Sequence, residues 1–151
     1  MAARSPQGKK VPSNRFNIDA FYHPDNERPG SLNVPGGYFL EGDPADFDPT
    51  FFGISPVEAI WMDPQQRKLL EVVYEAFESS GTPLHRVSEI LTGCFIGSFT
   101  SDFQQMSFKE HDFRHTYSAT GVDPGVLANR IAHVFNLRGP RSENATMLTS
   151  M

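Results

Sequence analysis

Two helix starts led by proline constrain the fold of this chain more than any other feature. The segment Ser55-Pro56-Val57-Glu58 places a capping serine three residues before a glutamate, which predicts a capping box and a helix of about two turns. Asp63-Pro64 repeats the device, and apolar residues then recur at helical spacing, at Leu69, Leu70, Val72, Val73, Ala76 and Phe77. Gly81 is placed for a left-handed cap, so the second helix should end near Ser80.

Other segments complete the expected architecture. Thr92–Phe99 is short, apolar and contains two glycines, which predicts a strand buried on both faces. Asp123-Pro124 predicts the start of a third helix, whose apolar positions continue to Phe135. Tyr38–Leu40, between glycine-containing turns, predicts a short edge strand, and residues 46–52 predict a loop packed through aromatic rings. The expected class is α/β.

Length and composition limit the possible classes of protein. With 151 residues and 38% hydrophobic residues, the chain is expected to form one globular domain. Its single cysteine, Cys94, excludes a disulfide framework within the chain. The net charge of −5 disfavours binding to a phosphate backbone. No apolar run approaches the ~18 residues that span a bilayer, and the polar, basic start is unlike a secretory signal, so a cytoplasmic location is expected.

The five histidines are the first candidates for acid–base or metal chemistry. His111 and His115 are four residues apart, but Glu110 precedes the first of them, so the zinc pattern H-E-x-x-H is not met. His23 and His85 are expected in loops. His133 is expected to be a partly buried histidine with satisfied hydrogen bonds. We therefore expect no metal site.

Nucleophiles and cofactor motifs are equally scarce. Cys94 lies in an apolar segment, where burial would raise the pKa of the thiol and leave it inert. Ser98 lacks the second glycine of a nucleophile elbow. Neither a phosphate-binding glycine loop nor, in residues 43–48, a calcium loop is present. Asn144-Ala145-Thr146 matches a glycosylation sequon only by chance if no secretory signal is present. No bound cofactor is expected.

The order of the segments nevertheless carries a clear resemblance. Those concerned are Arg15–Asp25, Gly36–Leu40, Asp46–Asp48, Phe51–Ala59, Met62–Arg67, Leu69–Glu71, Tyr74–Ala76, Gly81, Gly97–Thr100 with Asp102, Ala119–Gly121, Asn129–Ile131 and Leu137–Pro140. Together they resemble the N-terminal half of a β-ketoacyl synthase (ketosynthase) domain, as found in fungal, highly reducing type I polyketide synthases. The resemblance runs from about Ser5 to Pro140.

The resemblance implies a thiolase-like fold, in which two related α/β halves are stacked in layers and two such folds pair as a dimer. It also implies a chemistry, in which an active-site cysteine takes an acyl group as a thioester. Two histidines promote decarboxylation of malonyl on a phosphopantetheine-carrying acyl carrier protein, and the carbanion attacks the thioester. The implied reaction is a decarboxylative Claisen condensation in polyketide, a secondary metabolite, biosynthesis. Homodimer-type contacts and the carrier protein are the implied partners.

This chain departs from the family where the nucleophile is expected. Counting on from Gly139-Pro140 puts Leu148 at the position of the cysteine, and leucine cannot form a thioester. The family's two histidines lie beyond that point, and none of the five here matches their motifs. We therefore expect no catalytic residue in the chain and an incomplete thiolase-like fold that lacks the first strand and the cysteine-bearing elbow. The strand at Cys94 is then expected to have unpaired edges.

The expected boundaries are a polar segment at 1–14, a partial ketosynthase domain at 15–140 and a divergent tail at 141–151. Three hypotheses remain open. The chain is a non-catalytic, truncated part of a polyketide synthase; or it is a binding module that docks on a full-length synthase or its carrier protein; or it is one half of an enzyme whose cysteine and histidines come from another polypeptide.

Overall fold

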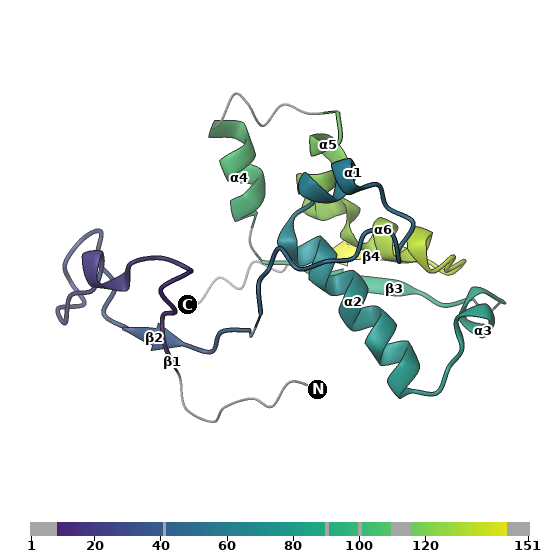
Figure 1. The fold of residues 1–151 in the computed structure, drawn as a ribbon, viewed down its shortest axis with the longest axis horizontal. Coiled ribbons are helices and arrows are strands. Elements are labelled where there is room, and N and C mark those ends of the chain that lie inside the picture. Colours follow the sequence, from purple (N-terminus) through teal and green to yellow (C-terminus); the bar gives the residue numbers. More distant parts are fainter. Residues whose placement is uncertain (1–8, 41, 90, 100, 110–115, 145–151) are drawn as a thin grey trace. The chain divides into compact units, whose positions relative to one another are not determined.

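The computed structural model describes residues 9–40, 42–89, 91–99, 101–109 and 116–144 (Figure 1). Its internal contacts divide the chain into two compact units, Met1–Asp43 and Pro44–Met151. The first unit is small and loop-rich. The second contains the described α-helices and the main hydrophobic core, so most of the functional residues considered below come from it.

The first unit is held by a two-residue ladder. β1 (Lys9–Lys10) pairs antiparallel with β2 (Gly36–Gly37), and a 3-10 helix at Ile18–Ala20 buries Ile18. A side chain at Gly36 would collide with the Lys9 carbonyl oxygen, so glycine is required for this pairing. The expected strand at Tyr38–Leu40 is therefore wrong by two residues. Tyr38 and Leu40 lie outside the ladder and are 75% and 79% exposed.

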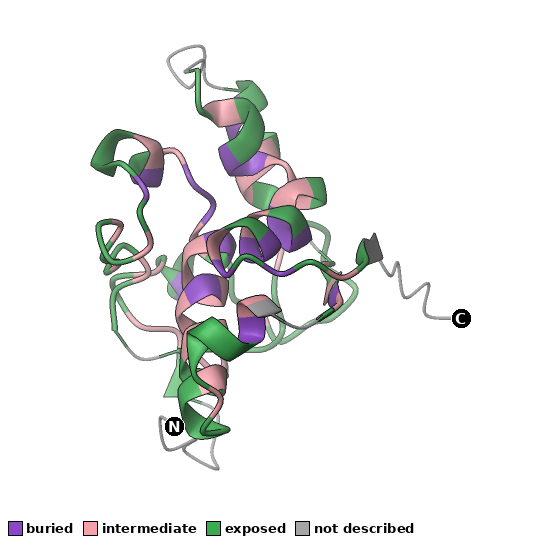
Figure 2. Cartoon of the chain, turned by 90° about the vertical axis from the view of Figure 1, so that its right-hand side faces the viewer, coloured by how far each residue is buried: buried purple, intermediate pink, exposed green. Residues whose placement is uncertain are grey.

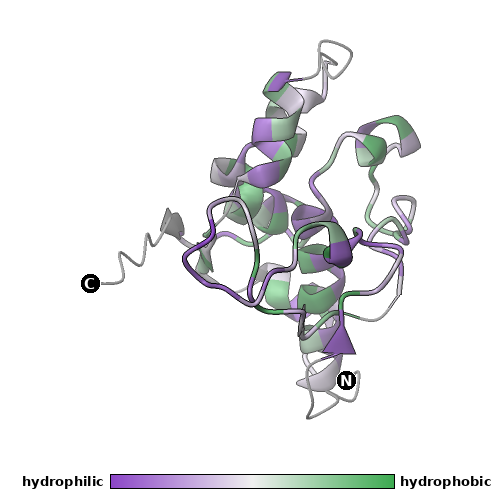
Figure 3. Ribbon diagram, turned by 90° about the vertical axis from the view of Figure 1, so that its left-hand side faces the viewer, coloured by the Kyte–Doolittle hydropathy of each residue, from purple (hydrophilic) through white to green (hydrophobic). Residues whose placement is uncertain are grey.

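Six α-helices are described in the second unit. They are α1 (Pro56–Ile60), α2 (Pro64–Ser79), α3 (Leu84–Glu89), α4 (Asp102–Lys109), α5 (Ser118–Val122) and α6 (Leu127–Val134), the last preceded by a 3-10 helix at Pro124–Val126. Polar and apolar residues alternate along these helices (Figure 3). Buried positions lie mainly on helix sides that face other elements (Figure 2). The helices are therefore amphipathic and are held by packing on one side.

The caps predicted from the sequence are confirmed. The Ser55 hydroxyl accepts a hydrogen bond from the Glu58 amide at 3.2 Å, and α1 is five residues long, shorter than expected. The Asp63 carboxylate accepts one from the Gln65 amide at 2.7 Å. α2 ends at Ser79 with Gly81 at a φ of 68°. These interactions satisfy amide groups that the first turn of a helix leaves without partners.

The second sheet has two parallel strands, β3 (Cys94–Gly97) and β4 (Arg141–Asn144), in a register that places Cys94 opposite Arg141. α6 packs against both strands. Two expectations are corrected here. One edge of β3 is paired, because residues assigned to a divergent tail form β4. The strand is also covered on one face only, since Cys94 is buried while Phe95, which points the other way, is 66% exposed.

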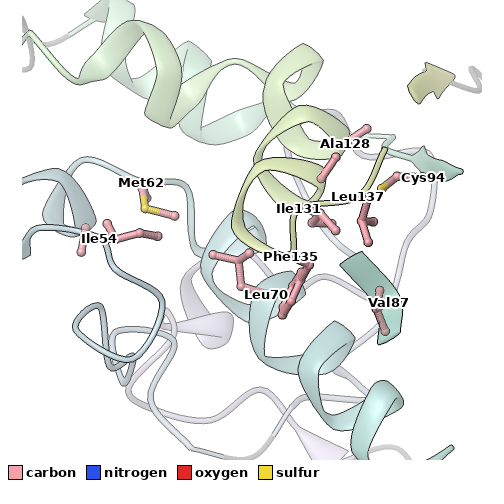
Figure 4. Close-up of a cluster of buried hydrophobic side chains, with 11 residues drawn as sticks. Ile54, Met62, Leu70, Val87, Cys94, Ala128, Ile131, Phe135 and Leu137 are labelled. Atoms are coloured by element: carbon pink, nitrogen blue, oxygen red, sulfur yellow. The ribbon is translucent and has the colours of Figure 1, made fainter. Parts of the chain in front are cut away.

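The core of the second unit lies between α2, α6 and β3 (Figure 4). Its buried members are Ile54, Ala59, Met62, Leu70, Val87, Cys94, Ala128, Ile131, Ala132, Phe135 and Leu137. The predicted aromatic loop is confirmed. Phe47 stacks on Phe52 with ring centres 5.3 Å apart, and Phe52 meets Phe135 edge-on at 6.4 Å. The loop before α1 is thus attached to the end of α6.

Candidate functional site

Cys94, the cysteine of the chain, lies at the start of β3 and is buried. Removal from water raises the pKa of its thiol, and the positive charge of Arg141 on the neighbouring strand lowers it by less. The Arg141 guanidinium donates instead to the Leu137 carbonyl at 3.2 Å. A thiol with a raised pKa is a poor nucleophile at neutral pH, so the predicted inert role of Cys94 is supported by its surroundings.

The described histidines do not form a catalytic group with it. His23 lies in a loop, as predicted, and its Nδ1 accepts a hydrogen bond from the Asp25 amide at 3.1 Å. His85 was expected in a loop but lies in α3, and His133 was expected to be partly buried but is exposed. Both side chains are exposed, because each lies on the outer side of a short helix whose other side packs on the core.

Three further residues considered in the sequence lie outside the described residues, namely His111, His115 and Leu148. The assignment of Leu148 to the nucleophile position therefore stays a prediction. Within the described residues, no group of three or more histidine, cysteine, aspartate or glutamate side chains could hold a metal ion.

The most organised polar group of the second unit connects the start of α2 with α5 and α6. We call it the polar junction and define it as Glu58, Asp63, Gln66, Thr120 and Arg130. The guanidinium Nη1 of Arg130 forms an ion pair with Glu58 Oε1 at 2.7 Å, and its Nη2 donates to the Thr120 carbonyl at 3.3 Å. Only 10% of the Arg130 side chain and 24% of the Glu58 side chain are exposed. The pair is therefore shielded from much of the solvent screening.

Gln66 adds a second set of bonds to the same backbone. Its side-chain amide donates to the carbonyl oxygens of Thr120 at 3.3 Å and of Asp123 at 3.4 Å, and the residue is 2% exposed. Its own oxygen Oε1 is buried and has no hydrogen-bond partner. A buried amide is costly unless it is bonded, so these two donated bonds are what retains Gln66 in the core.

Asp63 completes the junction through its backbone. Its amide donates to the Gly121 carbonyl at 2.8 Å. Burial raises the pKa of its carboxyl group, and the hydrogen bond from the Gln65 amide offsets this in part. A side chain on Gly121 would collide with the Trp61 carbonyl oxygen. Glycine therefore allows α5 to approach the α1–α2 turn closely.

Segments far apart in the sequence meet at the junction. Met62–Arg67, Ala119–Gly121 and Asn129–Ile131 each contribute to it, and all three carry the family resemblance. Sequence reasoning missed Gln66, which it did not assign to the buried face of α2. The available signal was its spacing of four residues from both Met62 and Leu70, the two apolar residues with 0% exposure. The bonds of the junction run between helices and to backbone carbonyl groups, so they hold these backbone segments in position.

Comparison with known families gives a match over nearly the whole chain. The family model "Beta-ketoacyl synthase, N-terminal domain" matches residues 2–150. The chain is 68% identical to "Reducing polyketide synthase DEP5" of Alternaria brassicicola over 140 residues, which are 93% of this chain and 6% of that protein. It is 55% identical to "Highly reducing polyketide synthase srdA" of Neurospora crassa over 139 residues, 92% of this chain and 6% of that protein.

Solved structures agree with these relatives. The chain resembles the oxazolomycin ketosynthase domain of Streptomyces albus with a TM-score of 0.79 and 34% identity, covering 92% of this chain and 24% of that one. It resembles the ketosynthase from module 6 of the bacillaene synthase of Bacillus subtilis with a TM-score of 0.66 and 28% identity, covering 90% of this chain and 21% of that one. No helix in the described part of the chain is long and apolar enough to cross a membrane.

Proposed function

Because this chain belongs to the family of β-ketoacyl synthase N-terminal domains, we propose that it forms part of the scaffold of a ketosynthase and performs no condensation by itself. Family membership confirms the resemblance found in the sequence, including its similarity to fungal, highly reducing polyketide synthases. The matched region is about 6% of the length of these relatives. We therefore propose that this region works within a protein of that kind, and we do not assign the activity of the whole protein to the chain alone.

The state of Cys94 carries the proposal. Ketosynthases work with a carrier protein, and by resemblance the acyl group that arrives on phosphopantetheine has to pass to a cysteine thiolate. Cys94 is buried in β3 with a raised pKa, so the described residues do not fit this transfer. The assignment of Leu148 to the family's nucleophile position supports the same conclusion. By this proposal, the chain supplies part of a thiolase-like fold, with β4 at Arg141–Asn144 included in it.

Acylation of the chain tests the proposal directly. We expect intact-mass spectrometry to show no acyl adduct after incubation with an acyl-pantetheine thioester, and no decarboxylation of malonyl-carrier protein. The oxazolomycin ketosynthase domain, treated in parallel, is the positive control. An acyl adduct on the natively folded chain would show that the chain has its own nucleophile and would overturn the proposal.

The exposed face of β3 favours a second candidate function, a binding module for a full-length synthase. Phe95 and the nearby Leu91 and Phe99 are 66%, 83% and 74% exposed, which is unusual for large apolar side chains near a sheet. Docking through this face would be supported if the chain co-purifies with a full-length ketosynthase and the Phe95→Asp variant does not. If the variant is retained as well as the wild-type chain, docking through this face is excluded.

A further inference from the structure

A second surface of the Pro44–Met151 unit combines exposed aromatic rings with acidic side chains. It is a hollow of about 490 Å³ between the outer side of α2 and the loop before α1. Its lining residues, here called the acidic aromatic groove, are Asp48, Phe51, Phe52, Glu71, Tyr74, Glu75 and Glu78. A neighbouring hollow of about 440 Å³ shares Tyr74 and Glu78 with it and continues toward α3. The two hollows are neighbours along α2.

The floor of the groove is aromatic and fixed. Phe51 packs edge-on against Tyr74 with ring centres 4.8 Å apart, and against Phe52 at 4.9 Å. Phe51 is nevertheless 56% exposed, so part of its ring is available to a partner. The Tyr74 hydroxyl donates to Glu78 Oε1 at 2.8 Å, and this bond raises the pKa of the tyrosine. This hydrogen bond and the contact with the Phe51 ring hold the tyrosine in place.

The rim carries more negative charge than the chain neutralises there. Glu71, Glu75 and Glu78 follow each other at spacings of four and three residues, so they share one side of α2. Like charges at these spacings destabilise a helix by ~0.2–0.5 kcal/mol per pair. Lys68 pairs with Glu71 at 2.9 Å. Asp48, from the facing loop, adds a further carboxylate to the lining.

This combination specifies the charge and the shape of a partner. Aromatic faces attract cations, and carboxylates pair with guanidinium groups through parallel hydrogen bonds. The exposed part of the Phe51 ring would be covered by an apolar side chain next to the cation. We propose that the acidic aromatic groove is a docking surface for a basic peptide segment of a partner protein, in which arginine side chains alternate with apolar ones. This inference is independent of whether the chain can be acylated.

Binding of a defined peptide tests the inference. The probe is a short, fluorescently labelled peptide that alternates arginine and leucine, and its partner probe replaces each arginine by citrulline, which has the same shape and no charge. We expect fluorescence anisotropy to show about tenfold weaker binding of the citrulline peptide, and weaker binding of the arginine peptide as salt rises. Equal binding of the two peptides would overturn the inference.

Matched variants distinguish peptide binding in the groove from nonspecific attraction to a negatively charged protein. The variant Glu75→Gln/Glu78→Gln removes two charges from the groove, while Asp25→Asn/Glu27→Gln removes two exposed charges from the first unit. We expect about tenfold weaker peptide binding for the first variant and no change for the second. All four changed residues are exposed, and circular dichroism checks that each variant is folded. Equal weakening in both variants would overturn the inference.

A third variant and a measurement of size complete the test. Phe51→Ala should weaken binding of the arginine peptide because it removes the exposed ring. An unchanged affinity would contradict the proposed contribution of the Phe51 ring to peptide binding. Analytical ultracentrifugation of the chain without peptide tests the other occupant of such a surface, a second copy. A dimer that Glu75→Gln/Glu78→Gln dissociates would show that the groove is self-associating and would overturn the proposal of a basic partner.

Discussion

Arg130 and Glu58 form an ion pair of 2.7 Å although 72 residues separate them in the sequence. The pair joins the first helix of the second unit to the last, and the same arginine donates to the Thr120 carbonyl. Its Nε atom is buried and has no hydrogen-bond partner. The Arg130 side chain therefore bonds to Glu58 and to the Thr120 carbonyl. Loss of Glu58 would leave a largely buried positive charge without its counter-ion.

A double-mutant cycle should show this coupling. We expect Glu58→Gln and Arg130→Met to have a coupling energy of about 1–2 kcal/mol in the free energy of unfolding. The more exposed pair Lys68–Glu71, three residues apart on α2, is the control and should give about 0.2–0.5 kcal/mol. Urea denaturation of the single and double variants measures both. Equal coupling energies would mean that burial of the Arg130 pair adds nothing.

Gly121 provides a test in which two effects have opposite signs. Helix propensity alone favours alanine over glycine by about 1 kcal/mol within a helix. A side chain at this position would collide with the Trp61 carbonyl oxygen, and such overpacking costs about 1–3 kcal/mol. We expect the collision to dominate, so Gly121→Ala should lower the melting temperature.

The control for this substitution is Gly97→Ala. An added Cβ at Gly97 meets no atom within 4 Å, so the free energy of unfolding should change by less than about 0.5 kcal/mol. A Gly121→Ala variant that is more stable than the wild type would refute the close approach of α5 to the α1–α2 turn.

The local part of this fold was predictable and the non-local part was not. The caps at Ser55 and Asp63 depend on neighbouring residues, so sequence spacing was sufficient to place α1 and α2. β4 could not be found in this way. Its sequence Arg-Ser-Glu-Asn has no apolar alternation, and it is a strand because it pairs with β3. α3 and α5 are short. Tyr117, the residue before α5, makes no side-chain capping bond, so the signal that identifies α1 and α2 is missing there.

The candidate site shows the same division. The inert character of Cys94 followed from its apolar neighbours in sequence, and burial in β3 agrees with it. The polar junction depends on contacts between residues more than fifty positions apart, such as Gln66 with Thr120. Helical periodicity alone placed Val72 and Ala76 among the inward positions of α2, yet both are exposed, because α6 covers only the side that carries Gln66 and Leu70.

Gln66 should be far more sensitive to substitution than its neighbour. Gln66→Met keeps a side chain of similar length but removes the donor to the carbonyl groups of Thr120 and Asp123. The Thr120 carbonyl keeps the Arg130 guanidinium as a donor and the Asp123 carbonyl keeps the Val126 amide, so the cost is that of two lost hydrogen bonds, about 1–2 kcal/mol of unfolding free energy. Gln65→Met, at an exposed position of the same helix turn, is the control and should change it by less than about 0.5 kcal/mol. Similar losses in both variants would argue against the junction.

The thiol of Cys94 should react slowly while the chain is folded. Burial raises its pKa, so less thiolate is present at pH 8 than for a free cysteine, and access is limited as well. We expect iodoacetamide to modify the native chain at least about tenfold more slowly than the chain in urea. Cys94→Ala/Phe99→Cys moves the thiol to a position that is 74% exposed and should react at the rate seen in urea. Equal rates for the two native proteins would contradict the buried position of Cys94.

Asp63 gives a pH dependence with a defined sign. Burial raises the pKa of its carboxyl group above the ordinary value of 3.8. A group with a raised pKa in the folded state contributes stability that is complete below the unfolded pKa and is lost as pH rises through the folded pKa. Asp63→Asn retains an oxygen that can accept the hydrogen bond from the Gln65 amide but does not titrate. The unfolding free energy of the wild type, measured relative to Asp63→Asn by urea denaturation, should therefore increase as pH falls from neutrality toward about pH 4. A relative stability that falls over this interval would mean that the charged cap interaction outweighs the cost of burial at the start of α2.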